Sequence, residues 1–383
     1  MKKDWTYKKF ADLFNLNMGK TPARANEKYW TNGKYPWVAI SDLSSNKYIS
    51  HTKEQISQEA IDETNIHLVP KGTVIMSFKL SIGKTAITPF DLYTNEAIMA
   101  FEPKTGIDVL PDFLYYYLQH YPWSGNRAVK GETINKALIS NSYACIPPLV
   151  DQELIVRELD AIHGILEKKQ EQLRELDHLA QTIFYDMFGD PITNPKQWEV
   201  KKFSEAFHLN MGKTPARADE RYWRDGIHPW VSISDLSSGE TLSQTKEKIS
   251  QIAVNETNIY LVPKGTVIMS FKLSIGKTAI VPCNLYTNEA IMAFEPKEGI
   301  DATSHYLYHY LQYYHWTGSN RAVKGETINK TIISNSKAIL PPLSLQQSFA
   351  AKIEAIEAQK TAIRQSIREA EALLAERMDH YFN

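Results

Sequence analysis

The sequence predicts an α+β protein with two similar globular heads, each followed by a long helix. The two helices are expected to form an antiparallel coiled coil, which would relate the heads by a pseudo-two-fold axis. Three observations predict this fold class: the chain repeats itself once, a heptad pattern follows each copy, and the heads contain short β-prone runs. A length of 383 residues suits about two domains at roughly 100–200 residues each.

The internal repeat covers almost the whole chain. "LVPKGTVIMSFKLSIGKTAI" is identical at 68–87 and 261–280, an offset of 193 residues. One residue is inserted between "WSGNR" and "WTGSNR", and the offset is then 194 as far as Phe188 and Phe382. This period is far too long for a solenoid, so each half is one copy of one unit. The expected segments are head 1 at 1–147, helix 1 at 148–188, a linker at 189–197, head 2 at 198–341 and helix 2 at 342–383.

Each head is expected to combine short strands with short helices. "TVIMSF" and "AIMAF" are β-prone runs bounded by the turn-forming "PKG" and "TNE". "DFLYYYLQHY" at 112–121 is expected to form a short helix.

The segments after the heads are expected to be long helices with an apolar seam. Apolar residues recur in steps of four and three, and a lysine, Lys169 or Lys360, interrupts each seam. Diprolines at 147–148 and 341–342 favour sharp helix starts, and "GDPITNP" at 189–195 ends the first helix. Each seam could pair with the other, serve a partner's helices, or simply form a homodimer. The seam residues are Ile155, Leu159, Ile162, Leu166, Leu173 and Leu176, and then Ile353, Ile356, Ile363, Ile367 and Leu374.

Charge and composition limit the function classes. The formal net charge is −1, but residues 1–148 hold 17 basic and 14 acidic side chains, and residues 189–342 hold 17 and 15. Mildly basic heads permit nucleic-acid binding without requiring it. Two cysteines make no disulfide framework, which suits a reducing cytosol. The sequence has no signal peptide or transmembrane run, so we expect a cytoplasmic protein without a membrane partner.

The motifs of catalysis are not recognisable. "GKT" occurs at 19–21, 83–85, 212–214 and 276–278. A phosphate-binding loop also needs a glycine five residues earlier, where Phe14, Phe78, Phe207 and Phe271 stand. No nucleophile triad or metal pattern is found. His51 and His67 become Gln244 and Tyr260 in the second copy, so we expect surface residues. The repeated acids Asp42/Asp235 and Glu96/Glu289 are more typical of satisfied loop carboxylates than of catalytic groups.

Repeated basic loops are the candidate DNA-binding elements. Lysine, arginine, serine and threonine are the usual phosphate contacts, and arginine or lysine can read guanine edges. The competing interpretation is that these are solvated loop charges. Trp30, Trp37, Trp223 and Trp230 could stack on bases, although core packing is favoured. The candidate DNA-binding residues are Lys20, Thr21, Arg24, Ser41, Lys79, Ser81, Lys84, Arg127, Lys130 and Lys136, and their equivalents Lys213, Thr214, Arg217, Ser234, Lys272, Ser274, Lys277, Arg321, Lys324 and Lys330.

The order of "GKTPAR", "PWVAISDL", "LVPKGTVIMSF", "SIGKTAI", "TNEAI" and "IPPLVDQELIVRELD" resembles the specificity subunits of bacterial type I restriction–modification systems. The resemblance covers essentially the whole chain, twice. It implies two target-recognition heads on antiparallel helices, each reading half of a bipartite double-stranded DNA target. It implies a non-catalytic chain without a cofactor of its own. The expected partners are methylation subunits, two of them, using S-adenosylmethionine, and restriction subunits using ATP and Mg²⁺.

The chain departs from that family in the likeness of its heads. Family members commonly carry two dissimilar heads, whereas here every basic loop is repeated. Identical reading surfaces predict a palindromic bipartite site, as dimeric readers predict palindromic operators. Differences such as Asn46/Gly239 and His51/Gln244 could tune one half. The alternative function is a coiled-coil adaptor with protein- or RNA-binding heads. An enzyme with an unrecognised site is disfavoured.

Overall fold

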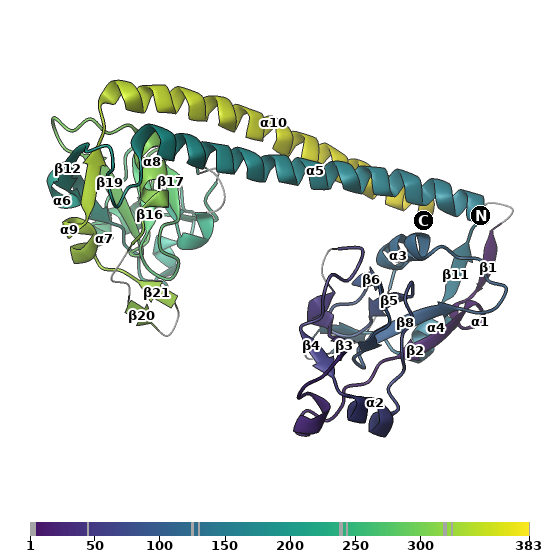
Figure 1. Ribbon diagram of the computed structural model, residues 1–383. Helices are drawn as coiled ribbons and strands as arrows, with labels where there is room; N and C mark the ends of the chain where they lie inside the picture. The colour runs from purple at the N-terminus through teal and green to yellow at the C-terminus, as the bar shows by residue number, and fades with distance from the viewer. Residues whose placement is uncertain are drawn as a thin grey trace. The chain divides into compact units, whose positions relative to one another are not determined.

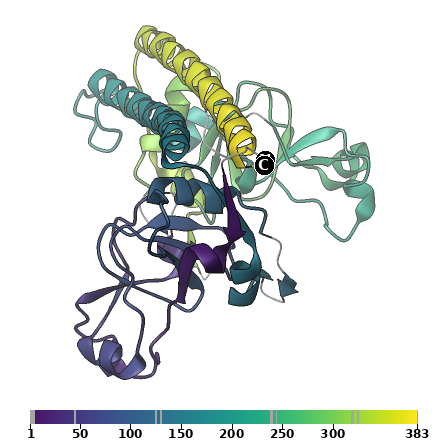
Figure 2. The same ribbon diagram turned by 90° about the vertical axis from the view of Figure 1, so that its right-hand side faces the viewer.

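The computed structural model describes residues 5–43, 46–123, 126–128, 131–236, 240–242, 244–316, 320–322 and 325–382. It forms two compact units (Figures 1 and 2). One unit contains Met1–Lys169 and Ser366–Asn383, and the other contains Gln170–Gln365. Each unit therefore holds one head with a segment of both long helices. The division falls within the helices, whereas the sequence repeat places the segment boundaries at helix ends.

Head 1 combines small antiparallel sheets with short helices. β2, β8, β5 and β6 form one antiparallel sheet, while β4, β3 and β7 form another, in which β3 and β7 run parallel. β1 pairs with β11, and β9 pairs with β10. The elements are β1 Thr6–Lys9, α1 Phe10–Leu13, β2 Phe14–Met18, β3 Tyr35–Val38, β4 Glu54–Ile56, α2 Gln58–Thr64, β5 Val74–Ser77, β6 Thr85–Ile87, β7 Tyr93–Thr94, β8 Ile98–Pro103, α3 Pro111–His120, β9 Asn126–Ala128, β10 Gly131–Thr133, α4 Lys136–Asn141 and β11 Tyr143–Ile146, with 3-10 turns at Glu27–Tyr29 and Ile40–Asp42.

The predicted strands "TVIMSF" and "AIMAF" are confirmed as β5 and β8, and the predicted helix at 112–121 is confirmed as α3. Every residue of β5 is buried, because the sheet is covered on both faces. Val74 and Met76 pack in the cluster that includes α3 and the start of the first long helix. Ile75 packs in a second cluster under the smaller sheet. Since successive strand residues face opposite ways, two-sided burial explains the continuous apolar run.

Head 2 repeats these elements with the same pairing. Its main sheet is β13, β19, β16 and β17, and Ile268 pairs with Ala293 as Ile75 pairs with Ala100 in head 1. The elements are β12 Glu199–Lys202, α6 Phe203–Ala206, β13 Phe207–Met211, β14 His228–Val231, β15 Glu247–Ile249, α7 Gln251–Thr257, β16 Val267–Ser270, β17 Thr278–Ile280, β18 Tyr286–Thr287, β19 Ile291–Pro296, α8 Ser304–Tyr313, β20 Asn320–Ala322, β21 Gly325–Thr327, α9 Lys330–Asn335 and β22 Lys337–Leu340, with 3-10 turns at Glu220–Tyr222 and Ile233–Asp235.

The long helices are α5, Leu149–Phe188, and α10, Leu343–Phe382 (Figure 1). Each begins directly after its diproline, as predicted, and α5 ends before Gly189, whose φ is +80°. Within the second unit the two helices run antiparallel. There the Lys360 ammonium lies 2.7 Å from Asp177, whereas Phe349, nearer the start of α10, packs on Phe188, at the end of α5. No helix in the described residues is both long and apolar enough to cross a membrane.

The apolar seam of the helices is buried most deeply near the heads. The buried members are Ile155, Leu159, Ile162, Leu166, Ile353 and Ile356, and the half-buried members are Leu173, Leu176, Ile363, Ile367 and Leu374. At the end of α5 the buried positions are Phe184 and Phe188, one residue after Ile183 and Met187, where the four-and-three spacing of the seam would continue. In a straight α-helix, positions seven residues apart are rotated by about 20° around the helix axis. Over several heptads, the buried face therefore moves to neighbouring positions of the sequence.

The joint between each head and its helix contains a fully buried glutamine. The Gln152 amide N–H donates to the carbonyls of Asp108 (3.0 Å) and Pro147 (2.8 Å), and its oxygen accepts from the Leu110 N–H (2.7 Å). Gln346 makes the same three bonds in head 2. Its partners there are Asp301, Pro341 and Thr303. No recognised motif marks these residues in the sequence, although the repeat places a glutamine in the first turn of both helices.

Candidate nucleic-acid interface

The turn between β7 and β8 holds the basic loops of head 1 together. The Lys20 N–H donates to the carbonyl of Thr94 (2.8 Å), and the Phe78 N–H donates to that of Ala97 (2.9 Å). Phe78 in turn accepts from the N–H of Ile134 (3.1 Å), which follows the β9–β10 hairpin. Three loops that are distant in sequence therefore meet around the "TNEA" turn. Head 2 repeats these bonds through Lys213, Thr287, Phe271, Ala290 and Ile328.

The glycines of the "GKT" triplets have structural roles. A Cβ on Gly19 would lie 2.0 Å from the carbonyl oxygen of Thr94, so only glycine permits this close approach. Gly83 lies in the β5–β6 connection with φ of +84°, a conformation that favours glycine. Both triplets are thus explained by the packing of the loops, which agrees with the missing first glycine of a phosphate-binding loop.

Arg24 is held in one orientation by two tryptophans and a carboxylate. Its guanidinium carbon lies 3.9 Å from the ring centre of Trp30 and 4.9 Å from that of Trp37. Its two terminal nitrogens donate to the two oxygens of Glu54, at 2.9 Å for Nη2. The hydrogen bond from Arg24 lowers the pKa of Glu54, although burial acts in the opposite direction. The Arg24 side chain is still half-exposed, so it is pre-oriented and remains accessible.

The tryptophans beside this arginine are mainly packing residues, as the sequence favoured. Trp37 is buried, and its indole N–H donates to the Lys20 carbonyl (3.0 Å). Trp30 is half-buried and meets Trp37 edge to face. Head 2 has the same arrangement, with the Arg217 carbon 3.8 Å from Trp223. Arg217 also contacts the Trp230 ring and donates a hydrogen bond to Glu247.

The acidic residues of the interface are structural in this chain. The Thr21 hydroxyl donates to the carboxylate of Glu96. Burial acts to raise the pKa of Glu96, but the Thr21 hydroxyl, the backbone and the cations Lys79 and Arg24 together lower it. Asp42 accepts the Ala39 N–H (2.9 Å), which closes a short turn. These contacts agree with the interpretation of both acids as satisfied loop carboxylates.

The other candidate residues lie on or beside the same loops. In head 1, the Lys20 ammonium caps α2 through the Thr64 carbonyl (2.6 Å), and Lys84 and Lys136 are exposed. Ser41 is exposed on its 3-10 turn, and Ser81 lies in the β5–β6 connection. In head 2, Lys213, Thr214, Ser234, Lys272, Ser274, Lys277 and Lys330 occupy the equivalent positions. Lys130 and Lys324 lie outside the described residues, as do the side chains of Arg127 and Arg321. DNA contact by all of these residues remains a prediction.

Of the two histidines singled out by comparing the copies, His51 lies on the surface and His67 is half-buried. The His67 ring lies 2.6 Å from a Glu102 oxygen, and Tyr260 makes the equivalent 2.6 Å bond to Glu295 in head 2. His51 is exposed. Gly239, which stands where head 1 has Asn46, lies outside the described residues.

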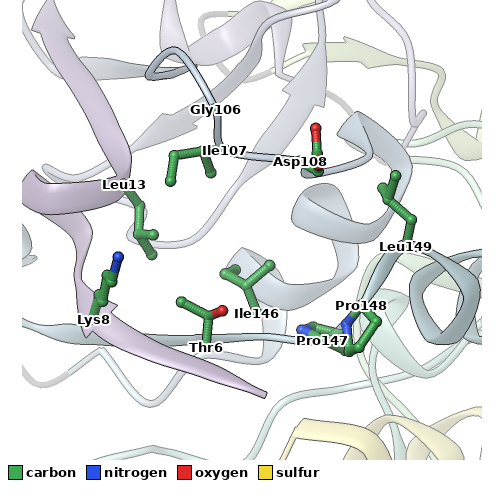
Figure 3. A pocket seen from close by; sticks show the side chains of 10 residues that line it. All are labelled: Thr6, Lys8, Leu13, Gly106, Ile107, Asp108, Ile146, Pro147, Pro148 and Leu149. Carbon is green, nitrogen blue, oxygen red and sulfur yellow. The ribbon is translucent and has the colours of Figure 1, made fainter. Parts of the chain in front are cut away.

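The cavities at the head–helix joints lie away from these loops. One of about 440 Å³ lies between β1, β11 and the start of α5, and its lining includes Lys8, Ile107 and Ile146 (Figure 3). A cavity of about 340 Å³ occupies the equivalent place in head 2. In the described part of the chain no cluster of three or more histidine, cysteine or acidic residues could hold a metal ion. The candidate interface is thus a loop surface and not a cavity.

A charged contact between head and helix, which was not expected from the sequence, differs between the two copies. In head 1, the Lys47 ammonium lies 2.5 Å from Asp112 and 2.7 Å from Asp160 of α5. The equivalent of Lys47 in head 2 is Glu240, which lies 2.7 Å from the His305 ring. His305 and Glu354 replace the two aspartates. A base and an acid therefore change places at Lys47/Glu240 and Asp112/His305, while the helix position stays acidic. Comparison of the two copies position by position could have found this signal.

Comparison with known proteins agrees with this arrangement. The family model for the type I restriction modification DNA specificity domain matches residues 2–176 and 195–372. The chain belongs to this family, with one such domain in each half. It is 26% identical to the type I restriction enzyme MjaIX specificity subunit of Methanocaldococcus jannaschii over 382 residues, which is 91% of this chain and 85% of that protein. This membership favours target recognition over the adaptor interpretation.

Solved structures share the fold. A chain from a structure on complex assembly and conformational transition of the type I R-M system matches with a TM-score of 0.64 at 18% identity, covering all of this chain and 98% of that one. The S subunit of a type I system from M. genitalium matches with a TM-score of 0.50 at 11% identity, covering 98% and 95%. These likenesses support the α+β architecture of two heads with long helices.

Proposed function

We propose that this chain is the sequence-reading subunit of a type I restriction–modification complex and that its DNA target is a gapped palindrome. The observation that carries the proposal is the identity of the two candidate interfaces. Arg24 and Arg217 are each held by two tryptophans and a glutamate, with distances that agree within 0.1 Å. Two copies of one reading surface recognise the same half-site, and an antiparallel arrangement inverts one copy relative to the other.

Each half-site would be read by a few contacts from the loops around the "TNEA" turns. Bidentate contacts to base edges discriminate by about 1–3 kcal/mol each, while lysine contacts to phosphates give affinity that depends on salt. The near-neutral net charge of −1 predicts weak binding by the isolated chain. Tight binding would then require the methylation subunits to enclose the duplex.

The chain itself would supply recognition and no chemistry. In the proposed complex, two methylation subunits bring S-adenosylmethionine, and restriction subunits bring ATP and Mg²⁺. Exposed apolar side chains on the helices, such as Leu154, Leu179 and Leu373, support a role for α5 and α10 in recruiting these partners. The mass of the purified assembly, measured by native mass spectrometry, tests the number of methylation subunits.

A map of modified bases in the genome of the source cell, with and without this gene, tests the function. We expect a gapped palindromic motif that disappears on deletion. A gene-dependent but asymmetric motif would contradict the palindrome and keep the recognition role. Transfer of the gene with its methylation partner into a naive host, without any new methylated motif, would contradict the recognition role itself.

A further inference from the structure

One exposed leucine in each head occupies a strained backbone conformation. Leu80 has φ of +67° and Leu273 has φ of +66°, and their side chains are 56% and 50% exposed. The Ser81 N–H donates to the carbonyl of Lys79 (2.8 Å), which closes a three-residue γ-turn around Leu80. The turn around Leu273 has the same 2.8 Å bond. γ-Turns of positive φ are rare and strained for residues other than glycine.

Hydrogen bonds from a buried serine impose this strain. The hydroxyl of Ser77 donates to the Ser81 carbonyl, and its backbone N–H donates to the Lys84 carbonyl (2.8 Å). The Ser77 carbonyl accepts from the Gly83 N–H (3.0 Å). Ser270 makes the equivalent bonds in head 2. A glycine would adopt the same turn without strain, so the turn alone does not explain a leucine.

The leucine lies between two lysines of the candidate interface. Lys79 and Lys84 flank it in the loop, and Phe78, two residues before it, is bonded to both the "TNEA" turn and the exit of the β9–β10 hairpin. Half or more of each leucine side chain is exposed to solvent, so it contributes less to the core of the head than a buried leucine would. Its exposure and its strained support both indicate a contact that forms only with a ligand.

We propose that Leu80 and Leu273 each contact the 5-methyl group of a thymine in the major groove of their half-site. This inference rests on the proposed function. Base edges present one apolar group, the thymine methyl, and it lies in the major groove, where apolar side chains recognise it. Lys79 and Lys84 would contact the flanking phosphates and fix the position of the loop. Because both heads carry the leucine, the thymine occurs at symmetric positions of the palindrome.

The double variants Leu80→Ala/Leu273→Ala and Leu80→Gly/Leu273→Gly test this contact. Glycine relieves the γ-turn strain, so we expect the glycine variant to fold at least as stably as the parent while it no longer touches the methyl group. The matched control is Leu68→Ala/Leu261→Ala, which removes equally paired leucines that are 43% and 42% exposed and lie outside the basic loops. Modified-base maps should show one symmetric thymine position relaxed to other bases in the two loop variants only.

Binding of the complex with its methylation subunits to duplexes containing 2′-deoxyuridine gives the second measurement. Deoxyuridine lacks the methyl group and leaves base pairing unchanged. Loss of one buried methyl corresponds to about 0.8 kcal/mol, hence about four-fold weaker binding per half-site and about fifteen-fold for both. We expect this loss in the parent and in the control at the relaxed position, and no further loss in the alanine and glycine variants.

Three results would overturn the proposal. The first is an unchanged methylated motif in both loop variants. The second is a uniform loss of methylation or binding without relaxation at any position, which would indicate an apolar wedge between base pairs or a role in folding. The third is equal sensitivity to deoxyuridine in parent and variants. Absence of any methylated motif with the parent chain would instead contradict the proposed function, which makes the two failures distinguishable.

Discussion

Arg24 and Arg217 illustrate how a residue can be ordered before it binds. Each guanidinium is stacked on tryptophan and bonded to a carboxylate, yet half of the side chain remains in contact with solvent. A pre-oriented side chain loses less conformational entropy on binding than a free one. An exposed ion pair contributes only about 0.2–1 kcal/mol to stability, so the arrangement serves orientation more than folding.

The double variant Arg24→Ala/Arg217→Ala is expected to weaken binding to the DNA target about 10- to 100-fold for each bidentate interaction that it removes. Thermal unfolding should change little, because the ion pairs are exposed. Electrophoretic mobility shift of the methylation complex, with circular dichroism melting, checks both. The matched change Glu54→Gln/Glu247→Gln keeps the arginines and loosens them, so it should weaken binding less. Equal binding by the parent and the arginine variant would remove these residues from the interface.

At the scale of the elements, one buried glutamine amide connects each head to its long helix. Gln152 satisfies the Leu110 N–H and the carbonyls of Asp108 and Pro147, and its own side chain is fully buried. Buried polar groups without partners cost about 1–3 kcal/mol each. The glutamine thus fixes the direction in which the helix leaves the head, directly after the diproline.

Gln152→Leu is therefore expected to lower the free energy of unfolding by about 2–4 kcal/mol, since it leaves one N–H and two carbonyls unpaired. Urea denaturation followed by tryptophan fluorescence measures this change. Gln170→Leu, on an exposed position of the same helix, is the control and should change stability by less than about 0.5 kcal/mol. A similar effect of both variants would show that the buried amide contributes no more than an exposed one.

The exchanged charges at the joints predict different responses to pH in the two units. The hydrogen bond that the His305 ring donates to the Glu240 carboxylate raises the pKa of His305, and Glu354 and Glu357 add to this effect. That stabilisation is complete below the ordinary histidine pKa of about 6.5 and is lost as pH rises through the raised value. Burial lowers the pKa of His309 to about 3, with His305 and Lys360 adding to the shift. That contribution is present above about pH 6.5 and is lost as pH falls toward 3.

The second unit should therefore be most stable near pH 6.5 and should weaken on both sides. Lys47, in the first unit, has a pKa that its two aspartates raise despite burial, so that joint stays charged over the same range. His305→Gln should reduce the loss of stability between pH 6.5 and 8.5, measured by urea denaturation at each pH. The control Asp112→Asn alters the equivalent position of head 1 and should leave the shape of the pH profile unchanged. Parallel profiles for the parent and His305→Gln would refute this assignment.

At the scale of the whole molecule, the likeness of the two heads predicts equal contributions of the two heads to DNA binding. If both heads read the same half-site, then Arg24→Ala alone and Arg217→Ala alone should weaken binding to a symmetric target by the same factor. The double variant should combine the two effects, since distant sites are usually additive. Titration of a palindromic duplex against each variant measures the factors. A strong asymmetry between the single variants would show that the heads contribute unequally.

Much of the fold could be predicted because its signals are local. The strands of "TVIMSF" and "AIMAF", the helix α3 and the starts of α5 and α10 follow from short apolar runs and from the position of proline. Which residues are buried at the end of α5 could not be predicted in this way. Phe184 and Phe188 are buried there because they pack on Tyr306 of head 2. The basic loops could be located from their composition. The residues that hold them, such as Glu54 and Glu96, could not.

The sequence by itself determined that the chain is two copies of one unit, that each copy has a head and a long helix, and that all four "GKT" triplets lack the first glycine of a phosphate-binding loop. Repetition, periodicity and motif spacing are properties of the linear chain. Only the tertiary structure decided that Gly19 must be glycine, that Thr21 bonds to Glu96 across 75 positions, and that Leu80 is held outward in a strained turn. These features depend on contacts between segments distant along the chain, and no local pattern encodes which of them meet.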